Sequence, residues 1–187
     1  MTKLTYIAIT SLDGFIEDDS GGFDWAAPDS EVHAFINELI RPAGTYLYGR
    51  RMYETMAVWQ DVGTEPGAEV PPTELDFAEL WRAADKVVYS RTLEAVPTPR
   101  TRVEREFDAE GVQRLKDSAD RELAIGGPDI ARPAFAAGLI DDIHLLMQPL
   151  VIGGGKPGLP RGPRFDLELR DERRFASGVV YLHYARR

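Results

Sequence analysis

The chain alternates between short apolar runs and longer segments in which apolar residues recur every three or four positions. The short runs are rich in β-branched and aromatic side chains and predict strands, whereas the periodic segments predict helices. Strands are expected at 4–10, 45–48, 86–89 and 123–125, with a weaker signal at 101–107 and a short apolar return at 15–16. Helices are expected at 28–40, 50–56, 74–84, 109–119 and 130–137.

The pattern changes near residue 142, after which strand signals follow one another without helices between them. A long apolar run predicts a strand at 142–152, and looser alternation predicts strands at 165–169 and 179–184. This order favours an α/β fold with a mostly parallel central sheet and an antiparallel C-terminal end. The glycine-rich segment 153–158 is expected to be a flexible turn between antiparallel strands, in which Lys156 could lie near a ligand.

Composition narrows the class of protein. The 187 residues suggest one domain spanning 1–187, and the lack of cysteine excludes a disulfide framework and thiolate chemistry. The formal net charge of −9 argues against general binding to nucleic acid or to an anionic membrane, but leaves room for a local basic pocket. No apolar run approaches the ~18 residues that span a bilayer, and the N-terminus lacks the layout of a signal peptide, so a cytoplasmic protein is expected.

Two glycines end one of the predicted strands. Gly126 and Gly127 follow the apolar run 123–125, and a helical segment follows them. Glycines let the backbone turn tightly and approach a ligand closely, and the free N–H groups of the next helix attract anions such as phosphate. The alternative is an ordinary strand-to-helix turn capped by Asp129.

Two other predicted strands end in residues that suit phosphate. Gly49 is followed by Arg50 and Arg51, and the strand at 86–89 runs into Ser90 and Arg91. Cations at a helix N-terminus oppose the helix dipole, so the arginine pair indicates a bound polyanion; a solvated surface pair is the alternative. Because ligands of α/β sheets bind at the carboxyl ends of the strands, three such ends together predict a nucleotide cofactor.

Other motifs give weaker signals. No G-x-G-x-x-G motif follows the first strand, and Gly-Gly-Gly-Lys at 153–156 lacks the spacing of a P-loop. His33, His144 and His183 have no metal-ligand spacing and are expected to be core or surface residues, with no metal bound.

The start of the first helix offers two acids. Asp29 and Glu31, just after Trp25, are candidates for a catalytic proton donor if the chemistry is hydride transfer. The alternative is that they are first-turn acids that favour the helix dipole. Trp25 either anchors the preceding loop or forms a wall for a planar ligand.

An ordered set of motifs covers essentially the whole chain. The motifs are ITSLDGFI at 9–16 with FDW at 23–25, YGRRMYE at 48–54, the segment 86–92, IGG at 125–127 with Ile130 and Ala131, and the tail at 138–149 and 153–156. In this order they resemble the dihydrofolate-reductase-like family. The similarity is closest to the reductase domain of the bifunctional riboflavin-biosynthesis deaminase-reductase and its stand-alone relatives.

The resemblance implies a three-layer dihydrofolate-reductase-like fold with NADPH bound across the carboxyl edge of the sheet. It places the phosphates near the glycine–arginine and glycine-pair motifs, adenosine with its 2′-phosphate near the serine–arginine pair, and nicotinamide near the start of the chain. The implied cofactor-binding residues are Ile16, Gly49, Arg50, Arg51, Met52, Ser90, Arg91, Gly126, Gly127, Ile130 and Ala131, and the implied substrate-binding residues are Asp13 and Trp25.

The implied activity is NADPH-dependent reduction of a small nitrogen heterocycle by a homodimer, of the 5-amino-6-(5-phosphoribosylamino)uracil reductase type in riboflavin biosynthesis. The sequence contains no deaminase zinc motif, so reduction alone is expected. Dihydrofolate reductases hold the pterin with a helix acid at an offset that falls on Ser30 here, which argues against folate reduction. The alternatives are a dihydrofolate or pterin reductase, and a non-catalytic nucleotide-binding protein with the same fold.

Overall fold

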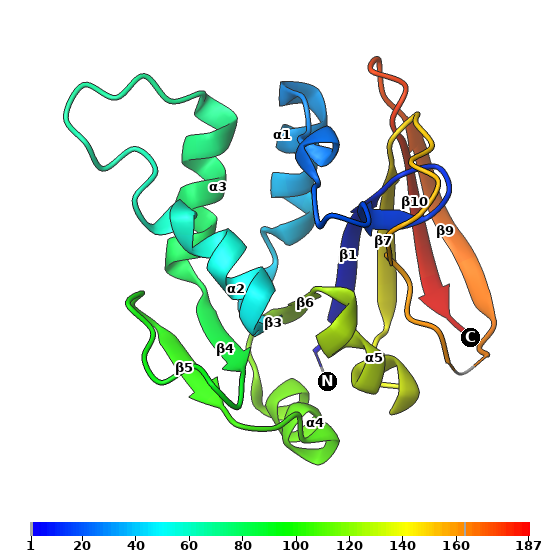
Figure 1. Ribbon diagram of the computed structural model, residues 1–187. Helices are drawn as coiled ribbons and strands as arrows, with labels where there is room; N and C mark the ends of the chain where they lie inside the picture. The colour runs from blue at the N-terminus through cyan, green and yellow to red at the C-terminus, as the bar shows by residue number, and fades with distance from the viewer. Residues whose placement is uncertain (1, 163) are drawn as a thin grey trace.

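The computed structural model describes residues 2–162 and 164–187, which form a layered α/β structure around one large sheet (Figure 1). Within these residues the sheet has eight strands in the order β5-β4-β3-β6-β1-β7-β10-β9. The strands are β1 (Leu4–Thr10), β3 (Ala43–Gly49), β4 (Asp85–Tyr89), β5 (Thr101–Glu104), β6 (Glu122–Gly126), β7 (Asp142–Met147), β9 (Leu167–Arg174) and β10 (Val180–Arg186).

The direction of the strands changes toward the C-terminus. β6 and β7 both pair in parallel with β1, and β3, β4 and β5 extend the parallel part on the other side of β6. β10 pairs antiparallel with β7 and with β9. The predicted mostly parallel sheet with an antiparallel C-terminal end is therefore confirmed. A separate short sheet joins β2 (Phe15–Glu17) to β8 (Lys156–Pro157).

Helices cover both faces of the sheet, which confirms the three-layer fold. Tyr46 and Tyr48 of β3 pack in one buried cluster with residues of α1, α2 and α3, whereas Leu47 between them packs with residues of α4 and α5. This division follows from the alternation of side chains along a strand. The helices are α1 (Ser30–Ile40), α2 (Arg50–Met56), α3 (Pro72–Ala83), α4 (Ala109–Ser118) and α5 (Pro128–Ala136), with short 3₁₀ turns η1 (Asp24–Ala26) and η2 (Ala57–Gln60).

The predicted strand at 142–152 is too long, and the segment after it is more than a turn. β7 ends at Met147, because Pro149 has no backbone N–H for a ladder and the next N–H, that of Leu150, donates back to the Gln148 carbonyl (2.8 Å). The segment 153–158, which was expected to be a turn, contains the short strand β8, and this strand pairs with β2 near the start of the chain. A Cβ on Gly155 would lie 2.0 Å from the Glu17 carbonyl oxygen, so this crossing requires glycine.

Two other strand boundaries differ from the prediction at the edges of the sheet. β5 ends at Glu104, so residues 105–107 leave the sheet. β9 runs well past the predicted 165–169, to Arg174. Its sequence LELRDERR is mostly charged because β9 is an edge strand with one exposed side, where charged side chains discourage pairing with other chains.

A polar network lies within the sheet where β7 meets β10. The His144 ring is buried, stacks on the His183 ring (4.2 Å between centroids) and shares a hydrogen bond with the Tyr181 hydroxyl through Nδ1 (2.7 Å). His183 in turn shares a hydrogen bond with the Asp142 carboxylate (2.8 Å), which also pairs with Lys3 (2.8 Å). Burial, followed by the charge of His183, lowers the pKa of His144 to about 4.

We expect the His144→Asn variant to lose less stability than the natural protein when the pH falls from 7 to 5. Because the His144 pKa drops from 6.5 to about 4 on folding, the unfolded chain takes up a proton in this interval and the folded chain does not. The contribution of His144 to the free energy of unfolding is fully present above pH ~6.5. It decreases by up to about 3 kcal/mol as the pH falls toward ~4. Asparagine preserves a partner for Tyr181 but does not titrate. Urea unfolding at both pH values measures the difference, and equal losses in the two proteins would contradict the assignment.

Candidate ligand site at the carboxyl edge of the sheet

Three neighbouring parallel strands end at the same level of the sheet. Gly49 of β3 lies opposite Tyr89 of β4, and Tyr48 lies opposite Gly126 of β6. Because adjacent strands lie about 4.8 Å apart, the three ends span about 10 Å and can serve one extended ligand. The structure thus brings together the three strand ends that the sequence singles out.

The glycine pair forms the turn from β6 into α5. Gly127 has φ +94°, which other residues rarely adopt, and it is the N-cap of α5. A Cβ on Gly126 would lie 3.1 Å from Met52 Cε and 3.1 Å from Tyr48 Cε1, so this position is tightly packed as well. Ile130 of α5 lies beside β3, since its Cβ is 3.8 Å from a Cβ built on Gly49. Five of the predicted cofactor residues therefore lie at or beside this turn, namely Gly49, Met52, Gly126, Gly127 and Ile130.

The N-terminus of α5 lacks the side-chain cap that α1 and α4 have. Asp29 caps α1 and Asp108 caps α4, whereas no side chain among the described residues caps α5, as is also true of α2 and α3. Asp129, which was the alternative cap, instead binds Lys156 (2.5 Å) and Arg132 (3.2 Å). Uncapped N–H groups and the helix dipole favour a negatively charged ligand group at this point.

Arg50 and Arg51 start α2 at the same edge and are both exposed. Arg50 donates to Glu54 (2.7 Å) and to the Thr92 hydroxyl (3.0 Å), so its guanidinium reaches across to the loop after β4. Arg51 pairs with Glu17 of β2 (3.3 Å). The Arg50–Glu54 pair is exposed and therefore weak, so an incoming phosphate can replace Glu54, whereas the Arg51 partner Glu17 is only 16% exposed.

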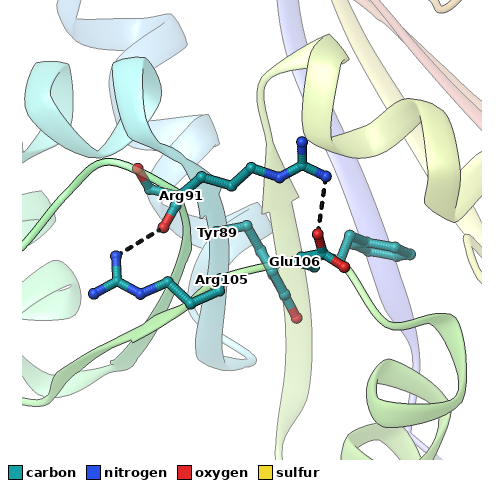
Figure 2. Close-up of a pocket in the computed structure, with 6 residues that line it drawn as sticks. Tyr89, Arg91, Arg105 and Glu106 are labelled. Atoms are coloured by element: carbon teal, nitrogen blue, oxygen red, sulfur yellow. Dashed lines mark hydrogen bonds and ion pairs between the residues drawn. The ribbon is translucent and has the colours of Figure 1, made fainter.

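A pocket of about 380 Å³ opens where β4 and β5 end. Figure 2 shows Arg91 extending across it to Glu106, and the two side chains form an ion pair of 3.0 Å. The rings of Tyr89 and Phe107, 5.4 Å apart, supply an aromatic surface. The lining residues are Tyr89, Ser90, Arg91, Arg105, Glu106 and Phe107.

Four of these six residues, Tyr89, Arg105, Glu106 and Phe107, were not among the predicted site residues. Arg105, Glu106 and Phe107 belong to the segment 101–107 that was expected to be one strand, whereas β5 ends before them and they turn into the pocket. Arg105 donates to the carbonyls of Ser90 (3.2 Å) and Leu93 (2.8 Å) and clamps the loop that carries Arg91. Arg105 could have been found by the signal that identified Arg91, namely a basic residue just after a strand.

The predicted substrate residues lie around β1, β2 and η1. Asp13 accepts hydrogen bonds from the Ile152 N–H (3.2 Å) and the Gly153 N–H (2.8 Å), so it ties the loop after β1 to the loop after β7. Ile16 lies in β2 and packs against the core beneath α5. Trp25 is half-buried in η1, and its indole Nε1 is buried without a hydrogen-bond partner in the part of the chain that the structure describes.

Both candidate acids make structural contacts. Asp29 accepts a hydrogen bond from the Val32 N–H (2.9 Å), and this bond holds the pKa of its carboxyl below the usual value. Glu31 binds Arg173 (3.3 Å) and the Ala176 N–H (3.2 Å), which joins α1 to the turn after β9. These contacts match the alternative role of first-turn acids at the helix start, and the catalytic role stays a prediction.

Ala131 differs from the rest of the predicted cofactor set. Its side chain is fully buried in the cluster that joins α5 to the sheet, and its backbone N–H donates to the Gly127 carbonyl (3.1 Å). This residue therefore helps to position α5, and its contact with a cofactor stays a prediction.

Two features are absent from the described residues, 2–162 and 164–187. No helix there is long and apolar enough to cross a membrane. The same residues contain no group of three His, Cys, Asp or Glu side chains that could hold a metal ion.

The layers, the strand order and the glycine-bordered edge define an α/β protein with the dihydrofolate-reductase-like fold. More specifically, the chain belongs to the RibD C-terminal domain family, whose model matches residues 2–181. It is 31% identical to the uncharacterized protein YyaP of Bacillus subtilis (strain 168) over 95% of this chain and 91% of that protein.

Solved structures share the fold at low sequence identity. A Shewanella sp. PV-4 protein named for riboflavin biosynthesis superposes with a TM-score of 0.76 at 18% identity, covering 100% of this chain and 99% of that one. The deaminase/5-amino-6-(5-phosphoribosylamino)uracil reductase of Thermotoga maritima gives a TM-score of 0.69 at 13% identity, covering 100% of this chain and 57% of that one. The expected resemblance is confirmed in family and in fold.

The Gly127→Ala variant should lose about 1–3 kcal/mol of unfolding free energy, because alanine is strained at φ +94°. Gly49→Ala is the matched control: Gly49 caps α2 at the same edge with φ −79°, and its added Cβ has ordinary contacts, so the change should stay below about 1 kcal/mol. Urea unfolding of both variants makes the comparison. Losses of equal size would rule out backbone strain as the reason for glycine at position 127.

Proposed function

We propose that this protein is an NADPH-dependent reductase that transfers hydride to a small nitrogen heterocycle, of the 5-amino-6-(5-phosphoribosylamino)uracil reductase type. The observation that carries the proposal is the shared register of β3, β4 and β6, which brings glycine, hydroxyl and arginine groups to one edge of the sheet. Such groups suit phosphates, and dinucleotides bind at this edge of α/β sheets. Membership of the RibD C-terminal domain family and the name of the Thermotoga neighbour support the reaction class.

The pyrophosphate end of the proposed site fits the donors present. Gly127 permits close approach of a ligand to the backbone, and the uncapped start of α5 offers N–H groups and a favourable dipole. Arg50 and Arg51 stand at the neighbouring strand end with carboxylate partners. In this proposal a phosphate replaces the exposed Glu54 on Arg50, and Met52 closes the turn from the side.

The adenosine end of the proposed site is the pocket between β4 and β5. The aromatic surface of Tyr89 and Phe107 suits a purine, and Arg91 beside Ser90 suits a 2′-phosphate. The strand order then directs the rest of the dinucleotide past β3 and β6 toward β1, where Ile16 would meet the nicotinamide. The length of an extended dinucleotide matches a path across several strands.

The chemistry proposed for the far end of the site needs little from the protein. Reduced nicotinamide supplies the hydride when it is bound, so the chain has to hold and orient the heterocycle and exclude bulk water. Trp25 would form a wall of the substrate pocket, and Asp13 would fix the loop at 150–153 around it. Because Asp29 and Glu31 are engaged elsewhere, the proposal takes the proton from water.

The remaining expectations belong to the same proposal. We propose a cytoplasmic homodimer that binds no nucleic acid, in keeping with the net charge of −9 and with the family resemblance.

NADPH should bind the purified protein and quench its tryptophan emission by energy transfer to the reduced nicotinamide. Binding should weaken as salt rises, since phosphate–arginine pairs are screened. The double variant Arg50→Ala/Arg91→Ala should bind about 100-fold more weakly, because each charge-assisted contact contributes about 1.5 kcal/mol.

The matched control for this titration is Arg100→Ala/Arg170→Ala. It also removes two exposed arginines that pair with carboxylates, Arg100 with Asp85 (3.0 Å) and Arg170 with Glu168 (3.1 Å), neither of which lines the pocket. Its affinity should stay within about threefold of the natural protein. Failure of the natural protein to bind NADPH at millimolar concentration would overturn the proposed function.

Turnover separates the reductase from its alternatives. Oxidation of NADPH, followed by the loss of absorbance of the reduced nicotinamide, should accelerate with 5-amino-6-(5-phosphoribosylamino)uracil and not with dihydrofolate, because the acid that holds a pterin is replaced by Ser30. Acceleration by dihydrofolate alone would favour the pterin reductase. Tight NADPH binding without turnover of either compound would favour the non-catalytic protein.

A further inference from the structure

The pocket at the ends of β4 and β5 holds two groups with opposite preferences for a ribose. Arg91 and Glu106 face each other across it at 3.0 Å, one from the loop after each strand (Figure 2). An arginine at the adenosine ribose of a dinucleotide accommodates a 2′-phosphate, whereas a carboxylate there accepts a hydrogen bond from a free 2′-hydroxyl. Both groups are present here, at one place.

The ion pair between them is suited to exchange partners. The two side chains are 79% and 71% exposed, so neither is fixed by packing. A phosphate oxygen can therefore take the place of the Glu106 carboxylate on Arg91. Glu106 lines the same pocket, so its carboxylate remains near the phosphate as a like charge.

Apart from the exposed Arg91–Glu106 pair, the contacts that hold the loop carrying Arg91 come from other residues. Arg105 already clamps that loop through the carbonyls of Ser90 (3.2 Å) and Leu93 (2.8 Å). The Ser90 N–H also donates to the Glu104 carbonyl (2.9 Å), which extends the ladder between the two strands. A carboxylate that is exposed, lines the pocket and is not needed for its walls is free to act on a ligand.

We propose that Glu106 is a specificity-determining residue that limits the preference of this protein for NADPH over NADH; the inference rests on the proposed function. Arg91 attracts the 2′-phosphate, and Glu106 opposes it and accepts a hydrogen bond from the 2′-hydroxyl of NADH instead. The natural protein therefore binds both reduced dinucleotides, with affinities within about tenfold of each other.

Titrations of NADPH and NADH into Glu106→Gln test the role. Glutamine has the same length but no charge, so the affinity for NADPH should rise about fivefold and that for NADH should fall about threefold. The ratio of the two affinities should shift by about tenfold or more in favour of NADPH. Glu104→Gln is the matched control, since Glu104 also pairs with an arginine, Arg102 (3.2 Å), on the same strand but does not line the pocket.

The outcomes distinguish this inference from the proposed function. If the natural protein binds neither dinucleotide, the proposed function fails. If it binds them and Glu106→Gln leaves their affinity ratio at the value of Glu104→Gln, the inference fails while the function stands. Arg91→Ala adds an independent measurement. In a protein that carries Arg91→Ala, Glu106→Gln should no longer raise the affinity for NADPH, because the arginine that binds the 2′-phosphate is missing.

Discussion

The register of β3 against its two parallel neighbours is the constraint on which the rest of the site depends. Hydrogen bonding fixes Gly49 opposite Tyr89 and Tyr48 opposite Gly126, so three chain segments leave the sheet at one level. A slip of one residue would move every side chain of β3 to the opposite face, and both cores would lose their partners. The buried clusters on the two faces of the sheet therefore hold the ligand edge in place.

Glycine at the end of β6 serves packing and chemistry together. The space beside Gly126 is already filled by Met52 and Tyr48, and Gly127 has a backbone conformation that favours glycine. The same backbone leaves the start of α5 open toward the edge. Packing in the core thus requires glycine at these positions, and the same glycines leave space for an anion. Because packing alone can explain the glycines, a short glycine motif indicates a ligand site only when the adjacent strand ends also carry suitable groups.

The sequence predicts what depends on local pattern and fails where distant segments meet. Periodicity locates the five helices and the parallel strands, and strand-end chemistry finds Arg91 and the glycine pair. It does not reveal that residues 105–107 turn into a pocket, because that depends on where β5 loses its partner β4. The apolar pattern also predicts a strand that continues past Met147, because apolar residues continue after the strand's hydrogen bonding stops. Lys156 binds Asp129 from β8, which pairs with β2. This contact joins segments that are distant in the sequence.

Carboxylates accompany the cations along the ligand edge. Arg50 pairs with Glu54, Arg51 with Glu17, Arg91 with Glu106 and Lys156 with Asp129. A bare row of such cations would attract any polyanion, whereas paired cations present a small net field. The Arg50–Glu54 and Arg91–Glu106 pairs are exposed on both sides and are inexpensive to break, so a ligand with several phosphates at the right spacing can exchange both partners at once. A single anion can replace only one carboxylate. This edge of the sheet therefore selects a ligand by the spacing of its negative charges more than by their number.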